Sequence, residues 1–133
     1  VSDADVVIMR YAHVLLMIAE AENEVNGPTE KALKAINAVR TRSHQPAIDG
    51  ANLTQAELRE RIRNEWRVET CFEGLRYFQL KRWKLLQQTV DGAVDPAYPA
   101  YKKVVTSAFE YFPLPQVEID KAHGVLVQDP NYQ

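Results

Sequence analysis

The sequence predicts an all-α fold: an antiparallel pair of helices, a longer bent helix and an irregular C-terminal segment. Apolar residues recur every three or four positions through the first part of the chain, and Gly27-Pro28 separates the first two helical stretches. The helical period then disappears from Gln88 to Phe112. Because 133 residues suit one domain, we expect residues 1–133 to form a single domain or a piece of one.

The first helix is predicted from Asp3 to Asn26, with Asp3 or Asp5 as its N-terminal cap. Apolar residues lie on several sides of it, which predicts neighbouring elements on more than one side. Gly27-Pro28 ends the helix, since Gly suits a C-terminal cap and Pro cannot continue a helix. The apolar stripe consists of Ile8, Tyr11, Ala12, Leu15, Ile18 and Ala19.

The second helix is predicted from its cap Thr29 to about Ser43. The short loop before it predicts an antiparallel pair. The pair has the size of a tetratricopeptide unit, about 34 residues. No second copy is visible in the sequence, and a lone pair cannot bury its own apolar face, so we expect it to stack on another element.

The third helix begins at a capping box formed by Thr54 and Glu57 and runs to near Phe72. Gly74 predicts either a bend or a stop. Residues 75–87 accordingly either continue this helix or form a fourth. The remaining predicted elements are an extended stretch over 102–112 and a helical turn over 116–121.

Composition and charge exclude several classes of protein. The chain holds 16 Lys and Arg against 18 Asp and Glu, and this balance disfavours a general nucleic-acid binder. Its apolar runs are too short to span a bilayer. The single cysteine, Cys71, excludes an internal disulfide. The sequence begins with Val1 and no signal stretch, so we expect either a removed targeting segment or a piece of a longer protein.

Carboxylates interrupt the apolar stripe of the third helix. On a helical wheel Glu65, Glu69 and Arg76 share the face of an apolar stripe. The apolar residues of that face are Leu58, Ile62 and Phe72. Buried charges need partners, and Arg76 is the nearest in sequence. We therefore expect a structural ion-pair network of Glu65, Glu69 and Arg76, in preference to a catalytic carboxylate pair of the glycosidase type. Other candidate partners are Arg10 and Arg82.

The sequence gives little support for a metal site or for a catalytic nucleophile. Glu65, Glu69 and Glu73 are spaced i, i+4, i+8, but the Glu-x-x-His pairs of di-metal bundles are missing. Cys71 is expected to be a small buried apolar residue. We therefore predict no catalytic residue, no metal and no cofactor. The histidines His13, His44 and His123 lie far apart in sequence.

The aromatic residues fall into two groups. Tyr98 and Tyr101 lie in the irregular segment, where exposed rings could stack on sugars, and we predict them as ligand-binding residues; anchoring of the loop is the alternative. The second group surrounds Gly74 and is expected to pack in the core. It consists of Trp66, Tyr77, Phe78 and Trp83.

Five segments, in order along the chain, resemble motifs of the SusD/RagB family. Residues 10–21 resemble its helix R-Y-A-E-V-L-L-x-x-A-E-A, and residues 35–42 resemble its next helix. Residues 58–83, and especially 67–83, resemble the signature R-x-E-x-x-F-E-G-x-R-x-x-D-L-x-R-W. Residues 112–120 and 128–132 resemble F-P-I-P-x-x-E-I and Q-N-P-G-Y. Departures are Gln79 in place of Asp, Trp66 in place of the usual Arg, and His13 in place of Glu.

The resemblance implies the C-terminal part of a longer, mostly helical lipoprotein on the outer membrane of Gram-negative bacteria. Such proteins carry tetratricopeptide-like helix pairs, are not enzymes, bind glycans or other nutrients, and deliver them to a SusC-like TonB-dependent transporter. The lipid anchor and most glycan-contacting residues would lie upstream of this chain, so membrane attachment would come only through that anchor. The alternatives are a helical-repeat adaptor that binds proteins and a glycoside hydrolase that uses Glu65 and Glu69.

Overall fold

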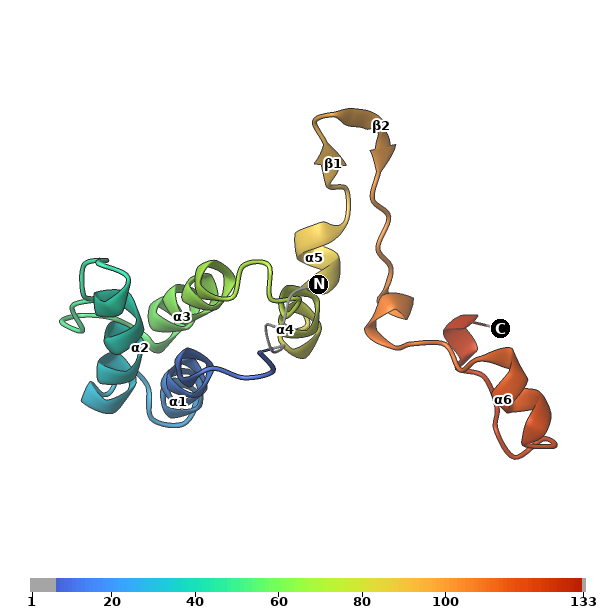
Figure 1. The fold of residues 1–133 in the computed structure, drawn as a ribbon, viewed down its shortest axis with the longest axis horizontal. Helices are drawn as coiled ribbons and strands as arrows, with labels where there is room; N and C mark the ends of the chain where they lie inside the picture. The colour runs from blue at the N-terminus through green and yellow to red at the C-terminus, as the bar shows by residue number, and fades with distance from the viewer. Residues whose placement is uncertain (1–6, 133) are drawn as a thin grey trace, which may run out of the picture. The chain divides into compact units, whose positions relative to one another are not determined.

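A computed structural model describes residues 7–132, and the chain divides into two compact units, Val1–Gly74 and Leu75–Gln133. The first unit holds three helices, and the second holds shorter helices and a two-stranded hairpin (Figure 1). This architecture confirms the predicted all-α class. The elements are α1 Tyr11–Asn26, α2 Glu30–Arg42, α3 Gln55–Glu69, α4 Arg76–Arg82, α5 Leu86–Val90, β1 Val94–Asp95, β2 Tyr98–Lys102, η1 Ser107–Glu110, α6 Gln116–Lys121 and η2 Pro130–Tyr132.

The start of α1 differs from the prediction. Asp3 and Asp5 lie outside the described residues, but residues 7–10 are not helical, and Ile8 is exposed. The backbone N–H of Arg10 instead donates to His13 Nδ1 across 3.3 Å, so the helix begins only at Tyr11. At its other end α1 stops as predicted, with Gly27 at φ +80°.

The N-terminal caps predicted for the second and third helices are confirmed. Thr29 Oγ1 accepts the N–H of Ala32 at 3.2 Å, and Thr54 Oγ1 accepts the N–H of Glu57 at 3.2 Å. Glu57 returns a bond by accepting the N–H of Thr54 at 2.8 Å. With these ends fixed, α1 packs against both α2 and α3. The closed core contains Leu16, Ile36, Val39, Leu58 and Ile62.

Of the two alternatives at Gly74, the structure has the stop. Helix α3 ends at Glu69, and the turn that follows places Phe72 at φ +65° and Gly74 at φ +74°. Phe72 is therefore fully exposed instead of sharing the face of Leu58, and Cys71 is exposed instead of buried. The predicted stretch 75–87 also divides into α4 and α5, because Lys84 adopts φ +57°.

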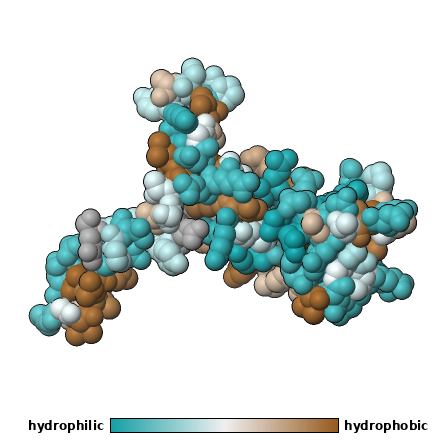
Figure 2. All heavy atoms as spheres, turned by 180° about the vertical axis from the view of Figure 1, so that it is seen from behind, coloured by the Kyte–Doolittle hydropathy of each residue, from teal (hydrophilic) through white to brown (hydrophobic). Residues whose placement is uncertain are grey.

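The second unit has a small core made of Leu80, Leu86 and Val105. The hairpin of β1 and β2 occupies part of the segment predicted as irregular, and η1 replaces much of the predicted extended stretch. Helix α6 forms where predicted, but none of its residues is buried. Figure 2 shows apolar residues gathered at the end of the chain that carries α6. Those exposed there are Val117, Val125, Leu126 and Val127.

No helix among the described residues is both long and apolar enough to cross a membrane.

Candidate functional site

The predicted ligand-binding pair, Tyr98 and Tyr101, lies on the hairpin strand β2. The side chains of both are exposed, and their ring centroids are 6.4 Å apart at an interplanar angle of 66°. In the hairpin Asp95 pairs with Tyr98, and Asp95 Oδ1 accepts the N–H of Ala97 at 2.8 Å, which tightens the connection. The pair can therefore present an aromatic ring face to a ligand, and its binding role stays a prediction.

Glu65 lies on the buried face of α3, with 6% of its side chain exposed. Arg40, near the end of α2, donates from Nη1 to Glu65 Oε2 at 2.6 Å. Arg40 also donates from Nε to the carbonyl of Pro46 at 2.9 Å, so its guanidinium is held in place from two sides. A charge-assisted bond of this kind offsets the cost of taking the carboxylate out of water.

Glu69 joins the ends of three helices. It is the last residue of α3, and 7% of its side chain is exposed. Arg10, just before α1, donates to Glu69 Oε1 at 2.7 Å and to its backbone carbonyl at 2.9 Å. Arg42, the last residue of α2, donates from Nη2 to both carboxylate oxygens at 2.6 Å. One carboxylate thus fixes the register of α1, α2 and α3.

Glu73 extends this network into the turn after α3. It accepts from the Arg10 guanidinium and lies 2.8 Å from His13 Nε2. Because His13 Nδ1 accepts the backbone N–H of Arg10, the ring proton sits on Nε2 and is donated to Glu73. The bond from Arg10 is the main cause that lowers the pKa of Glu73, and the bond to Glu73 is the main cause that raises the pKa of Arg10.

Trp66 and His13 also meet in the first unit. Trp66 is buried on α3 and donates from Nε1 to Glu20 Oε2 at 3.1 Å. Its ring centroid lies 5.9 Å from that of His13. The expectation that Trp66 packs in the core is therefore confirmed. Phe78, from the same predicted aromatic group, is exposed, which contradicts that expectation for this residue.

Arg76 is the first residue of α4, in the second unit. Its guanidinium carbon lies 5.9 Å from the centroid of the Trp83 ring. The pairing of Arg76 with Glu65 and Glu69 stays a prediction. The partners observed for the two carboxylates are Arg40, Arg10 and Arg42.

Sequence reasoning missed Arg40, Arg42 and the roles of His13 and Glu73. An antiparallel pair places the start of α1 near the end of α2, which could have pointed to Arg10 and Arg42 together. The sequence does not show how α3 is positioned along that pair, so the partners of its carboxylates could not be predicted. Guanidinium groups bind both carboxylate oxygens of Glu69 and the Oε2 atom of Glu65, as a structural ion-pair network requires. Within the described part of the chain, no cluster of His, Cys, Asp or Glu is arranged to hold a metal ion.

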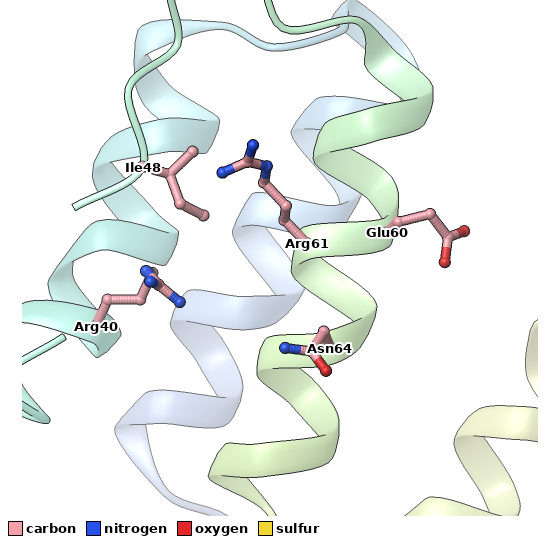
Figure 3. A pocket seen from close by; sticks show the side chains of 5 residues that line it. All are labelled: Arg40, Ile48, Glu60, Arg61 and Asn64. Carbon is pink, nitrogen blue, oxygen red and sulfur yellow. The ribbon is translucent and has the colours of Figure 1, made fainter. Parts of the chain in front are cut away.

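A groove of about 360 Å³ lies beside this network, between α2 and α3 (Figure 3). Arg61 and Arg40 extend into it, whereas Glu60 points away from it (Figure 3). Ile48, from the connection between the helices, also lines the groove, although only 6% of this residue is exposed. The lining is completed by Asn64.

The model of the SusD family matches residues 1–132. The SusD-like protein P2 of Formosa agariphila is 30% identical over 98% of this chain and 26% of its own length. A solved SusD-like protein from Bacteroides fragilis has a TM-score of 0.81 and 30% identity, over 96% of this chain and 26% of its own. Surface glycan-binding protein A from Bacteroides thetaiotaomicron has a TM-score of 0.74 and 29% identity, over 94% of this chain and 24% of its own. The chain thus spans about a quarter of the length of these relatives.

Proposed function

The chain belongs to the SusD family, and from this premise we propose that it is the C-terminal part of a nutrient-binding lipoprotein on the outer membrane. In this proposal the complete protein binds a glycan or another nutrient at the cell surface. It then delivers that ligand to a SusC-like TonB-dependent transporter. The observation that carries the proposal is the family match along residues 1–132, supported by likeness to a surface glycan-binding protein.

We assign the ion-pair network of the first unit a supporting role. Its carboxylates are bound to arginines and shielded from water, which suits a rigid scaffold and opposes a hydrolase that uses Glu65 and Glu69. Chromogenic glycosides should therefore show no turnover above background. Turnover that disappears in Glu69→Gln would restore the hydrolase alternative.

We assign ligand contact within this chain to Tyr98 and Tyr101, because both rings are exposed on one hairpin. Most of the binding surface would lie upstream, so this chain alone should bind oligosaccharides weakly. In the complete protein, Tyr98→Ala and Tyr101→Ala should each lower glycan affinity, measured by calorimetry. Tyr111→Ala, at an equally exposed tyrosine of the same unit, is the matched control and should leave the affinity unchanged.

The decisive experiment uses the complete protein purified from its own outer membrane. We expect a TonB-dependent transporter to copurify with it, and we expect growth on the cognate glycan to require both proteins. Purification of the complete protein without any bound transporter would contradict delivery of the ligand to a transporter. Sub-millimolar binding of an oligosaccharide by the 133-residue chain alone would contradict the upstream location of the main site.

A further inference from the structure

We propose that the groove between α2 and α3 binds a carboxylate carried on a sugar ring, as in a uronic acid. This inference rests on the proposed function, because it names the chemical class of a ligand that the complete protein would meet. It concerns a site separate from Tyr98 and Tyr101. The groove is lined by Arg40, Ile48, Glu60, Arg61 and Asn64 (Figure 3).

Arg61 supplies a positive charge that has no bonded partner among the described residues. Within the described residues its guanidinium forms no hydrogen bond and no ion pair, and its side chain is exposed and points into the groove. The carboxylate one turn before it, Glu57, is held by Thr54 in the capping box, and the bond from the Thr54 backbone is the main cause that lowers the pKa of Glu57. Arg61 adds only a smaller electrostatic contribution to that lowering. Arg61 is therefore available to an external anion.

Arg40 supplies a fixed donor opposite Arg61. Its Nη1 and Nε atoms are held by Glu65 and by the carbonyl of Pro46. Since these bonds are already made, little side-chain freedom remains to be lost when Nη2 meets a ligand. Glu65 neutralises most of the charge of Arg40, so Arg61 provides the net attraction and Arg40 provides direction.

The carboxylate of Glu60, which lies at the rim of the groove, points away from it (Figure 3). Glu60 points away from the groove in Figure 3, and Arg63 Nη1 donates to its Oε1 at 2.7 Å. Asn64 adds an exposed amide that can donate one bond and accept another. The polar lining therefore favours an anion that also carries hydroxyl groups.

The remaining features fit a sugar ring better than a small ion. The groove holds about 360 Å³, which falls in the range of about 300–1,000 Å³ of small-molecule sites. Ile48 adds a small apolar surface to the lining, because only 6% of this residue is exposed. Planar guanidinium groups match a planar carboxylate through paired N–H bonds. These properties together identify a uronate as the ligand class.

The test is an NMR titration of the ¹⁵N-labelled 133-residue chain with D-glucuronate, D-glucose and D-glucose 6-sulfate in parallel. We expect D-glucuronate to bind in the millimolar range and to shift the amide signals of Arg61, Asn64 and Ile48. D-glucose should give no saturable shift. D-glucose 6-sulfate should bind more weakly than D-glucuronate, because its anion is not planar.

Arg61→Gln should raise the dissociation constant for D-glucuronate about tenfold, the loss expected for one charge-assisted contact. Arg67→Gln is the matched control, since Arg67 is an exposed arginine of the same helix that does not line the groove. It should leave the constant unchanged. Because both side chains are exposed, neither substitution should disturb the fold. An NMR spectrum that matches that of the native chain away from the substituted residue verifies that each variant is folded.

Equal binding of D-glucose and D-glucuronate would overturn the proposal, as would equal weakening by Arg67→Gln and Arg61→Gln. Tighter binding of the sulfate ester would overturn the assignment to a carboxylate.

Failure of the groove proposal can be told apart from failure of the proposed function. Suppose that the complete protein copurifies with a transporter and binds a neutral glycan, but D-glucuronate does not shift the Asn64 signal of the 133-residue chain. This result would overturn only the proposal that the groove binds a uronate. Absence of the transporter would leave this titration unaffected.

Discussion

The two units stabilise themselves by different means. The first closes a core around Leu16, Leu58 and Ile62 and satisfies its buried carboxylates with arginines. The second has the small core of Leu80, Leu86 and Val105, and α6 has no buried residue. The contrast teaches that three long helices can close a core of their own, whereas short elements gain little from burial within their own unit.

The largest expected effect tests the network of the first unit. Glu69→Ala should lower the free energy of unfolding by about 3–5 kcal/mol, because Arg10 and Arg42 lose a shared buried partner. Glu118→Ala is the control in the second unit, where the exposed pair with Lys121 should contribute about 0–1 kcal/mol. Denaturant unfolding measures both. Equal small losses would place the Glu69 carboxylate in solvent and remove the contrast between the units.

The double variant Arg10→Ala with Glu69→Ala sharpens this result. Because the two side chains are in contact, the double variant should lose less stability than the sum of the single variants. Additive losses would mean that the contact contributes no coupling energy.

Core truncation should also separate the units. Leu58→Ala, at a residue with no exposed surface, should cost about 2–5 kcal/mol, since it removes buried methyl groups and leaves a cavity. Leu126→Ala, at a partly exposed leucine near α6, should cost less than about 1 kcal/mol because little apolar area is lost. Thermal unfolding of the variants measures the difference. A larger loss for Leu126→Ala would show that the second unit has a hidden core.

A smaller effect is expected at the helix caps. Thr54→Ala should cost about 1 kcal/mol, because the N–H of Glu57 loses its acceptor. Thr106→Ala is the matched control, since Thr106 precedes η1 but its side chain forms no cap bond. Its loss should be close to zero in the same denaturant experiment. Identical losses would contradict the assignment of the Thr54 cap.

The smallest effect concerns pH. Arg10 and His13 lower the pKa of Glu73 in the folded chain, so Glu73 binds a proton more readily in the unfolded chain. Its contribution to stability is therefore present above the ordinary glutamate pKa and is lost as the pH falls through the lowered value. The stability difference between the native chain and Glu73→Gln should shrink on acidification from pH 7 to pH 3. A constant difference across that range would contradict the ionic role.

The local parts of the fold could be predicted from the sequence. Thr29 and Thr54 mark helix starts through side-chain chemistry that acts within three residues, and both caps are present. The long-range parts could not. The partners of Glu65 and Glu69 depend on how α3 lies against α1 and α2, and sequence periodicity carries no information on that register.

The stop of α3 was uncertain for another reason. Phe72 adopts φ +65°, a conformation that an aromatic residue rarely takes, so its identity gave no signal for a helix end. The surrounding bonds of Glu73 to Arg10 and His13 hold the turn instead. The late start of α1 has a local origin, because the backbone N–H of Arg10 donates to His13 three residues later. Tertiary contacts therefore override local preference at the end of α3, whereas a local bond sets the start of α1.

The buried Trp66, with its indole N–H on Glu20, gives the chain an intrinsic optical reporter. The chain has two tryptophans, and Trp83 lies in the other unit beside the guanidinium groups of Arg76 and Arg82. Replacing Trp83 by Phe therefore leaves an emission signal that reports the first unit alone, and replacing Trp66 by Phe leaves one for the second. Red-shifted emission as each indole enters water would then record two melting profiles from one polypeptide.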